Sequence, residues 1–258
     1  LNTNAKKIIG YDNSEIDLFN LKNELDDFKR IKIYLGDILD TKLLDYLIKK
    51  EKIDLIFHAA AYKHVGILQE NINSAIRNNI FGTQSVLLSA KKNNIPIVTI
   101  STDKAVRPTS ILGLTKRISE IICLKHNNRN FSSKVVRFGN VFGSVGSAVP
   151  TFINQINNRM PITITHKNVK RFFMTLNDAC FLLLWSVKIK NVNNVLVLNM
   201  GKPIKILDIV NSLIKIKQKI DPHYSFIIKT IGLQKGEKMN EELTIIKNTK
   251  KTKNIDIS

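Results

Sequence analysis

Short runs of apolar, often β-branched residues alternate along the chain with longer segments whose apolar positions recur at helical spacing. This alternation is typical of a parallel sheet covered by helices. It predicts strands at 7–11, 31–35, 54–58, 97–101, 134–138 and 195–199. It predicts helices near 14–29, 41–51, 70–92, 110–127 and 176–189. We therefore expect an α/β fold with a doubly wound parallel sheet.

The pattern becomes less regular after residue 140. Glycines and serines at 143–147 precede an expected helix near 149–158 and a short strand around 162–165. We predict a larger domain made of 1–140 and 174–200, and a smaller substrate-binding lobe made of 141–173 and 201–258. Ligands of such sheets bind beyond the carboxyl ends of the strands, so the residues that follow each strand are the first candidates for a site.

Charge and composition narrow the class of protein. The 258 residues carry a formal net charge of +19, but 32 of the 40 basic residues are lysines, and 28 residues are asparagines. Both residue types have adenine-rich codons, and the lysines are spread along helix faces without interleaved aromatic residues, so we expect no nucleic-acid partner. Two distant cysteines, Cys123 and Cys180, and the lack of a signal peptide indicate a cytoplasmic protein. The longest apolar run, 179–187, is about half of a membrane span.

Residues 101–116 carry the most chemical information. A strand ending in Ser-Thr is followed by Pro108 and by a helix opened at Thr109 or Ser110, with Lys116 inside its second turn. This layout is similar to the active site of short-chain dehydrogenases/reductases, in which a tyrosine stands four residues before the lysine. Here that position is Leu112. Because an aliphatic side chain cannot transfer a proton, a simple alcohol dehydrogenase or a tyrosine-based epimerase is disfavoured.

Together with Thr102, Asp103 and Lys104, this segment resembles CapD-type polysaccharide biosynthesis enzymes, relatives of UDP-N-acetylglucosamine 4,6-dehydratases. Further matches cover nearly the whole chain, at 36–40, 58–65, 78–83, 136–144, 171–175, 200–203 and 236–238. The resemblance implies an extended short-chain dehydrogenase/reductase with a Rossmann-like NAD(P)-binding domain. The family's glycine-rich loop would precede Leu1, so we expect an N-terminally truncated chain that lacks the first βα unit.

The implied reaction explains the residue types. A 4,6-dehydratase moves hydride from C4 of the sugar to NAD(P)⁺, removes the C5 proton, expels the C6 hydroxyl as water and returns the hydride to C6. By resemblance, Asp103 is the acid, Lys104 is the base, and Thr102 binds the C4 hydroxyl. Lys116 would orient the nicotinamide ribose and help to remove the C4 proton. Without the surrounding match, a solvated turn pair would be the favoured interpretation of adjacent Asp103 and Lys104.

The same resemblance and the positions of the strand ends indicate which residues should contact the cofactor. Asp12 should face the adenosine ribose. Asp37 and Ile38 should face the edge of the adenine. The small side chains expected along the dinucleotide are Ala59, Ala60 and Ala61. Asp12 favours NAD, whereas the neighbouring Asn13 and Ser14 could accept a 2′-phosphate, so NAD and NADP both stay open.

The expected substrate is a UDP-sugar. The positions that match substrate contacts are Lys63, Asn140, Arg171 and Glu237. One departure is Gln234, which stands where the family has an arginine for the diphosphate. The five histidines show no ligand spacing, so we expect no metal site.

Three functions remain open. The favoured one is a sugar-nucleotide 4,6-dehydratase for surface polysaccharide, and the alternatives are a UDP-sugar epimerase of the same fold or a non-catalytic remnant. We also expect a homo-oligomer with no membrane segment in this chain. A longer parent protein could be anchored at the cytoplasmic face of the inner membrane, as relatives often are.

Overall fold

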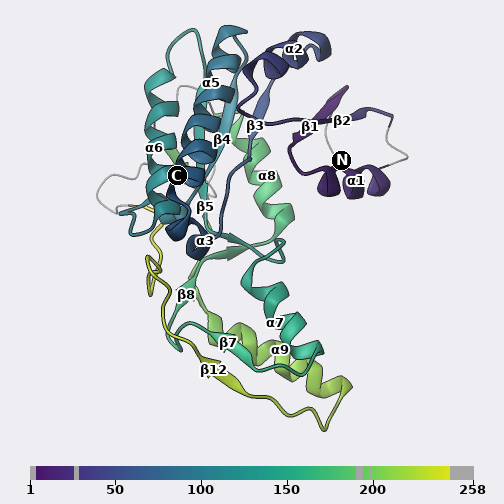
Figure 1. Cartoon of the computed structure of the whole chain (residues 1–258), viewed down its shortest axis with the longest axis vertical. Helices are drawn as coiled ribbons and strands as arrows, with labels where there is room; N and C mark the ends of the chain where they lie inside the picture. The colour runs from purple at the N-terminus through teal and green to yellow at the C-terminus, as the bar shows by residue number, and fades with distance from the viewer. Residues whose placement is uncertain (1–3, 26–28, 190–193, 198, 245–258) are drawn as a thin grey trace.

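The computed structural model describes residues 4–25, 29–189, 194–197 and 199–244. The molecule is elongated, with helices packed on a parallel sheet at one end and a smaller group of strands and helices at the other (Figure 1). The C-terminal segment runs from the small end back toward the large one (Figure 1).

The large end holds six strands that pair in parallel. They are β1 (Ile8–Asp12), β2 (Ile31–Leu35), β3 (Ile56–His58), β4 (Ile97–Thr102), β5 (Ser133–Phe138) and β10 (Val195–Val197). Four of them form one sheet in the order β10-β5-β4-β3, while β1 and β2 form a separate parallel pair. The predicted α/β class with a parallel sheet is confirmed, and every expected strand is found within two residues of its predicted start.

Helices cover both faces of the four-stranded sheet because its central strands are apolar on both sides. On one face, Val98 and Val136 pack with Leu182 of α8 (Leu176–Ser186). On the other, Ile97 and Val135 pack with the helices α5 (Thr83–Lys92) and α6 (Ile111–His126). Adjacent residues thus face opposite layers, as a fully buried parallel strand requires. The helix α1 (Glu15–Glu24) packs on β1 and β2, and α2 (Thr41–Glu51) packs against α5.

The predicted helix at 70–92 is more complex than its sequence pattern indicated. The chain forms α3 (Val65–Glu70), α4 (Ile72–Ala75), a π-helical segment η1 (Ile76–Gly82) and then α5. In η1, the fully buried Asn79 accepts the backbone N–H of Tyr62 at 2.8 Å and donates to Thr115 at 3.2 Å. These bonds join η1 to the segment after β3 and to α6.

The small end has its own apolar cluster, formed by 11 buried residues that include Phe152, Ile162 and Val210. Its helices are α7 (Ala148–Asn157) and α9 (Ile206–Ile220). Its strands are β7 (Ile162–Ile164), β8 (Lys170–Arg171), β11 (Ile204–Lys205) and β12 (Ile228–Thr230). Short β6 (Asn140–Val141) and β9 (Phe173–Met174) pair where the two ends meet. The domain boundaries given above stay a prediction.

Candidate active site

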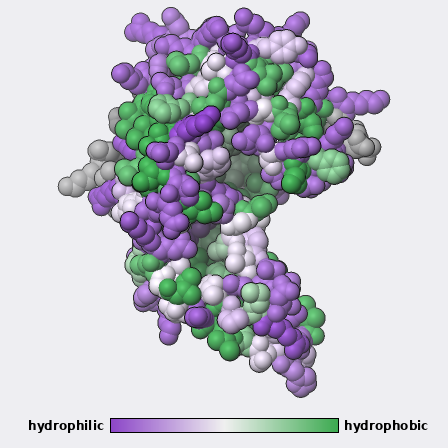
Figure 2. All heavy atoms as spheres, viewed as in Figure 1, coloured by the Kyte–Doolittle hydropathy of each residue, from purple (hydrophilic) through white to green (hydrophobic). Residues whose placement is uncertain are grey.

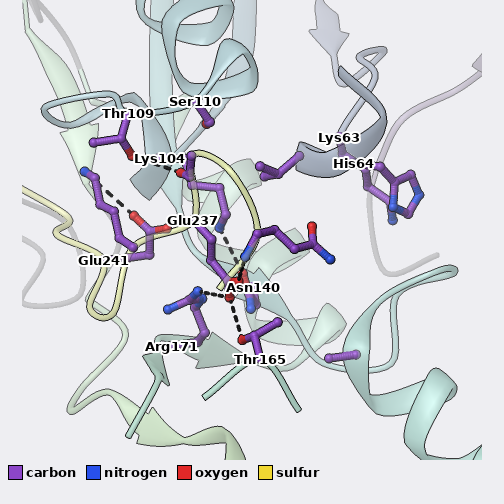
Figure 3. A pocket seen from close by; sticks show the side chains of 15 residues that line it. Lys63, His64, Lys104, Thr109, Ser110, Asn140, Thr165, Arg171, Glu237 and Glu241 are labelled. Carbon is purple, nitrogen blue, oxygen red and sulfur yellow. Dashed lines mark hydrogen bonds and ion pairs between the residues drawn. The ribbon is translucent and has the colours of Figure 1, made fainter. Parts of the chain in front are cut away.

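A cavity of about 260 Å³ lies between the carboxyl end of β4 and the small end of the molecule. Figure 2 shows the surface narrowed and hollowed between these two parts. Residues of the large end that line the cavity include Lys63, His64, Lys104, Ser110 and Asn140. Residues from the small end and the C-terminal segment include Thr165, Arg171, Gln234, Glu237, Lys238 and Glu241 (Figure 3).

The turn after β4 holds a buried ion pair. A short 3₁₀ helix, η2 (Asp103–Ala105), follows the strand, and its backbone is capped by the Thr102 hydroxyl. Asp103 is fully buried, and its Oδ1 accepts hydrogen bonds from Thr102 Oγ1 at 2.9 Å and from Lys104 Nζ at 3.0 Å. Lys104 also donates to Asn140 Oδ1 at 3.3 Å. A solvated surface turn does not describe this pair, since only the lysine reaches the cavity.

Lys116 lies on α6, which begins as predicted with Ser110 as its N-cap. The residue is 5% exposed, and its ammonium makes no hydrogen bond within the described part of the chain. Burial lowers the pKa of Lys116 to about 8, against the opposing influence of Cys123 and Glu120. Leu112, at the position of the family's tyrosine, packs on Leu68. A poorly solvated cation therefore stands behind the Asp103–Lys104 turn.

A second buried carboxylate fixes this region. Glu120, one helical turn after Lys116, is fully buried and accepts bonds from Ser101 Oγ at 2.6 Å and Arg137 Nε at 2.7 Å. Its other oxygen accepts from Arg137 Nη2 at 2.6 Å and Arg117 Nη1 at 2.9 Å. Ser101 is on β4 and Arg137 is on β5, so this network ties α6 to the two central strands.

His58, at the end of β3, is a neutral neighbour of Lys116. Burial, together with the nearby charge of Lys116, lowers its pKa to about 3. Its Nε2 lies 2.9 Å from the hydroxyl of Thr83, which itself donates to the carbonyl of Asn79 at 2.7 Å. Because Thr83 uses its hydrogen there, we assign the imidazole hydrogen to Nε2.

The predicted substrate residues Lys63, Asn140, Arg171 and Glu237 all line the cavity. Arg171 is 6% exposed, and its Nη2 pairs with Glu237 Oε1 at 2.7 Å. Its Nη1 donates to the carbonyl oxygens of Lys170 at 2.8 Å and Met239 at 3.3 Å. The guanidinium is therefore already anchored in the cavity wall. The ammonium of Lys63 donates to the carbonyl of Val145 at 2.6 Å.

Apart from Lys116, the residues predicted to contact the cofactor lie at or just after the ends of β1, β2 and β3, and none of them lines this cavity. Asp12 and Asp37 are exposed, and each accepts one backbone N–H, from Ser14 and Leu39, at 2.9 Å. After β3, Ala59 is exposed, whereas Ala60 and Ala61 are half-buried. The side chain of Ile38 is buried in the core against Gly82, so it is turned away from the surface.

Several cavity residues had no role assigned from sequence. Lys238 lies in a stretch that the family resemblance covered, after Gly236, whose φ of +83° and close approach to Ser110 suit only glycine. Glu241 follows three residues later and carried no sequence signal, because acidic residues in a charged C-terminal segment are ordinarily solvated. Its burial depends on packing of that segment against the large end of the molecule.

The described residues include neither a metal-binding cluster nor a membrane-spanning helix. No group of three or more histidine, cysteine, aspartate or glutamate side chains in that part of the chain is arranged to hold a metal ion. None of its helices combines the length and the apolar character needed to cross a membrane.

A helix-covered parallel sheet, a Thr-Asp-Lys turn after one strand and a buried lysine on the following helix define a Rossmann-like protein of the extended short-chain dehydrogenase/reductase class. Residues 1–257 match the model of the polysaccharide biosynthesis protein family, and the chain belongs to this family.

Individual relatives agree with this assignment. The capsular polysaccharide biosynthesis protein CapD of Staphylococcus aureus is 39% identical over 92% of this chain, which spans 41% of CapD. UDP-glucose 4-epimerase of Rickettsia bellii is 33% identical over 83% of this chain and 62% of that enzyme.

Solved structures agree on the fold. Pen from Bacillus thuringiensis is 34% identical and matches with a TM-score of 0.87 over 94% of this chain and 75% of Pen. DesIV, a dTDP-glucose 4,6-dehydratase from Streptomyces venezuelae with NAD bound, is 19% identical and matches with a TM-score of 0.82 over 95% and 81%.

Proposed function

We propose that this chain forms the catalytic part of an NAD(P)-dependent sugar-nucleotide 4,6-dehydratase that converts UDP-N-acetylglucosamine to a 4-keto-6-deoxy sugar nucleotide for a surface polysaccharide. The observation that carries the proposal is the buried Asp103–Lys104 pair, with the lysine at the cavity and the carboxyl behind it. An elimination needs a base and an acid close together, and this pair supplies both.

The proton balance supports these roles. In the elimination, neutral Lys104 takes the C5 proton, while protonated Asp103 gives its proton to the departing C6 oxygen, which leaves as water. The product state is Asp103 carboxylate beside Lys104 ammonium, the pairing that the structure has at 3.0 Å. Lys104 then returns its proton to C5 when C6 is reduced, and the proton released from the C4 hydroxyl returns to Asp103 through the Thr102 hydroxyl, which lies 2.9 Å from Asp103 Oδ1.

Two further side chains would act at C4. The Thr102 hydroxyl lies at the end of β4, where it can bind the C4 hydroxyl once its hydrogen bond to Asp103 is exchanged. Burial lowers the pKa of Lys116. The positive charge of Lys116 would stabilise the oxygen at C4 as the C4 hydroxyl loses its proton.

For the sugar nucleotide we propose contacts from Lys63, Asn140, Arg171 and Glu237. All four line one cavity, and two of them are cations that suit a diphosphate. The ion pair with Glu237 keeps Arg171 in place, so the arginine would offer its remaining donor directions without reorganising.

The strand-end residues fit NAD or NADP in part. The exposed carboxylate of Asp12 suits ribose hydroxyls, and the small side chains at Ala59, Ala60 and Ala61 leave the backbone after β3 accessible. Buried Ile38 offers no such surface. When bound, the nicotinamide supplies reversible hydride transfer with the sugar. DesIV, named above with NAD, supports this cofactor class.

The test is incubation of the chain with UDP-N-acetylglucosamine and NAD⁺ or NADP⁺, followed by mass spectrometry of the nucleotide sugar. Loss of one water with a new keto group is expected, and unchanged substrate would refute the dehydratase. A product of unchanged mass with altered stereochemistry would instead favour the epimerase, which the Rickettsia relative supports. Calorimetric titration with NAD⁺ and NADP⁺ tests the non-catalytic alternative, which tight binding would contradict.

A homo-oligomer remains part of the proposal. Large apolar side chains are exposed along η1 and α5 at Phe81 and Leu88, and along the neighbouring α6 at Leu114, Ile118 and Ile121. A row of this kind on paired helices is typical of a protein contact. Light scattering of the chain and of a Leu114→Lys, Ile118→Lys variant should give a higher mass only for the original sequence. The cytoplasmic location likewise stays a prediction.

A further inference from the structure

The charges around the Asp103 side of the cavity are nearly balanced. Asp103 pairs with Lys104 at 3.0 Å, and Glu237 pairs with Arg171 at 2.7 Å. The remaining carboxylate, Glu241, lies 3.9 Å from Lys238, too far for a hydrogen bond. Lys238 instead donates to the carbonyl of Val106 at 2.7 Å. Glu241 is therefore the most weakly held carboxylate of this set.

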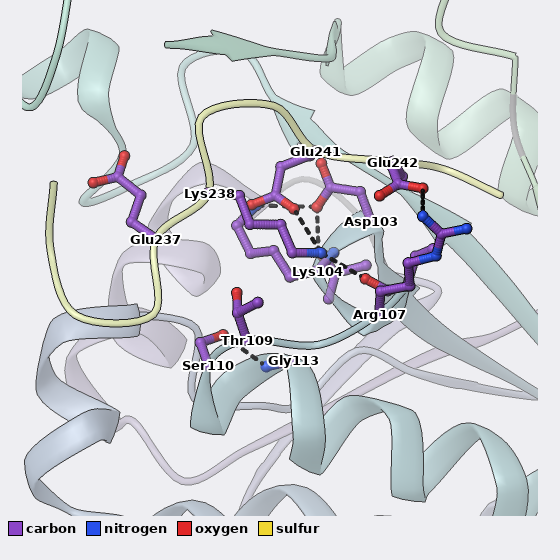
Figure 4. Close-up of polar contacts among 12 residues, drawn as sticks. Asp103, Lys104, Arg107, Thr109, Ser110, Gly113, Glu237, Lys238, Glu241 and Glu242 are labelled. Atoms are coloured by element: carbon purple, nitrogen blue, oxygen red, sulfur yellow. Dashed lines mark hydrogen bonds and ion pairs between the residues drawn. The ribbon is translucent and has the colours of Figure 1, made fainter. Parts of the chain in front are cut away.

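The surroundings of Glu241 disfavour its charged form. The residue is 8% exposed, it lines the cavity, and its Oε2 has no hydrogen-bond partner in the described part of the chain. Burial raises the pKa of Glu241, and the charge of Asp103 raises it further. The cations that oppose this shift come from three segments: Lys104 after β4, Arg171 on β8 and Lys238 on the C-terminal segment. Figure 4 shows Glu241 beside Asp103, with Lys104 and Lys238 close by.

We propose that Glu241 is a substrate-site residue that takes up one proton when an anionic sugar nucleotide binds in the cavity. The inference rests on the proposed function, because it takes that nucleotide as the ligand. The diphosphate brings two negative charges to the cations that now offset the charge of Glu241. Because the diphosphate then shares these cations with Glu241, they stabilise the Glu241 carboxylate less. Its Oε2 has no hydrogen-bond partner among the described residues, so Glu241 accepts a proton from the solvent and releases it when the ligand leaves.

The experiment is calorimetric titration of the full chain with UDP-N-acetylglucosamine in two buffers that differ in ionisation enthalpy. Both phosphates of this ligand are diesterified and do not titrate near neutral pH, so the ligand itself takes up no proton. The binding heat should differ between the buffers by an amount equivalent to as much as one proton per ligand. By linkage, affinity should fall as pH rises, by up to tenfold per pH unit.

Three variants test whether Glu241 is the group that takes up the proton. Glu241→Gln should bind with equal heat in both buffers and lose the pH slope. Glu241→Met should do the same, and it removes a buried unpartnered carboxyl, so it is expected to fold. The matched control is Glu242→Gln: this neighbouring glutamate has a 40% exposed side chain, pairs with Arg107 at 3.5 Å and does not line the cavity. It should keep the dependence on buffer and pH.

Binding of the wild type with equal heat in both buffers would overturn the inference and leave the proposed function standing. Persistence of the buffer dependence in Glu241→Gln or Glu241→Met would show that another group takes up the proton. If UDP-N-acetylglucosamine does not bind, the proposed substrate is wrong, and the inference fails with it.

Discussion

The two sides of the proposed site are built differently. On the side of β4 and α6, Asp103, Lys104 and Lys116 are at most one-fifth exposed, and the fully buried Glu120 joins both elements through Ser101 and Arg137. On the side of β1, Asp12 is exposed and is held only by a backbone turn.

A buried glutamate also holds the β1–β2 side together, but its lysine partner is more exposed than the arginine partner of Glu120. Glu51 at the end of α2 accepts bonds from Lys7 at 2.7 Å and Tyr34 at 2.6 Å, and the Lys7 side chain is 40% exposed. Such a lysine returns to water easily when its partner is lost. The comparison indicates that the side proposed for proton transfer is preorganised by buried charges, whereas the side proposed for the nucleotide presents exposed groups.

The largest expected effect is on the preorganised side. Asp103→Asn keeps the shape of the side chain but cannot donate an acidic proton, so kcat should fall by about 10²–10⁴-fold. Its unfolding free energy should fall, but by less than in Glu120→Ala, because the amide still accepts from Thr102 while Lys104, whose side chain is 19% exposed, loses its charged partner. Steady-state kinetics and urea unfolding of the same preparation measure both quantities. A kcat within tenfold of the wild type would remove Asp103 from the mechanism.

The next effect is on stability. Glu120→Ala leaves Arg137 buried without its partner, and removal of one member of such a pair costs about 3–5 kcal/mol. Urea unfolding followed by circular dichroism measures this loss. Glu51→Ala should cost less, since its lysine partners can be hydrated. Equal losses in the two variants would contradict the contrast between the two sides.

A matched control separates Glu120 from the exposed part of its network. Arg117 bonds to the same carboxylate at 2.9 Å, but its side chain is 44% exposed. Arg117→Ala should therefore cost less than about 1 kcal/mol, as surface pairs do. A larger loss would mean that the exposed Arg117–Glu120 pair, and not the buried Arg137–Glu120 pair, stabilises this region.

The buried Lys116 should make the free energy of unfolding depend on pH. Its pKa is lowered from 10.5 to about 8 in the folded protein, so between these values the unfolded chain binds more protons and stability rises with pH. A shift of this size corresponds to roughly 3 kcal/mol. Lys116→Met should abolish the rise and be more stable near pH 7, while losing activity. Unfolding curves at pH 7 and pH 10 test this, and an unchanged rise in the variant would exclude Lys116 as its source.

Prediction from sequence succeeded where local signals were strong. Alternation of apolar runs gave the strands, and the Ser110 cap with Lys116 gave the start of α6, because these features depend on neighbouring residues. The pairing of Arg171 with Glu237 was not predictable, although both residues were selected, since their contact joins positions 66 apart in the chain.

Three features of the fold and site were missed for similar reasons. The burial of Asn79 in the π-helical η1 goes with bonds to other segments, and the burial of Glu241 depends on where the C-terminal segment packs. The inward direction of Ile38 is set by its contact with Gly82. Long-range packing decides each of them, and a single sequence does not encode such contacts in a readable pattern.

The smallest expected effect tests the exposed side. Asp12→Asn removes the charge proposed to bind the adenosine ribose, so the dissociation constant of NAD⁺ should rise roughly 5- to 30-fold, equivalent to about 1–2 kcal/mol. The unfolding free energy should stay within about 0.5 kcal/mol, because Asp12 is exposed. At saturating cofactor, kcat should be unchanged, since Asp12 lies far from the proton-transfer pair in the chain and on a separate sheet. Calorimetry and kinetics measure these values, and a fall in kcat would mean that the two sides do not act independently.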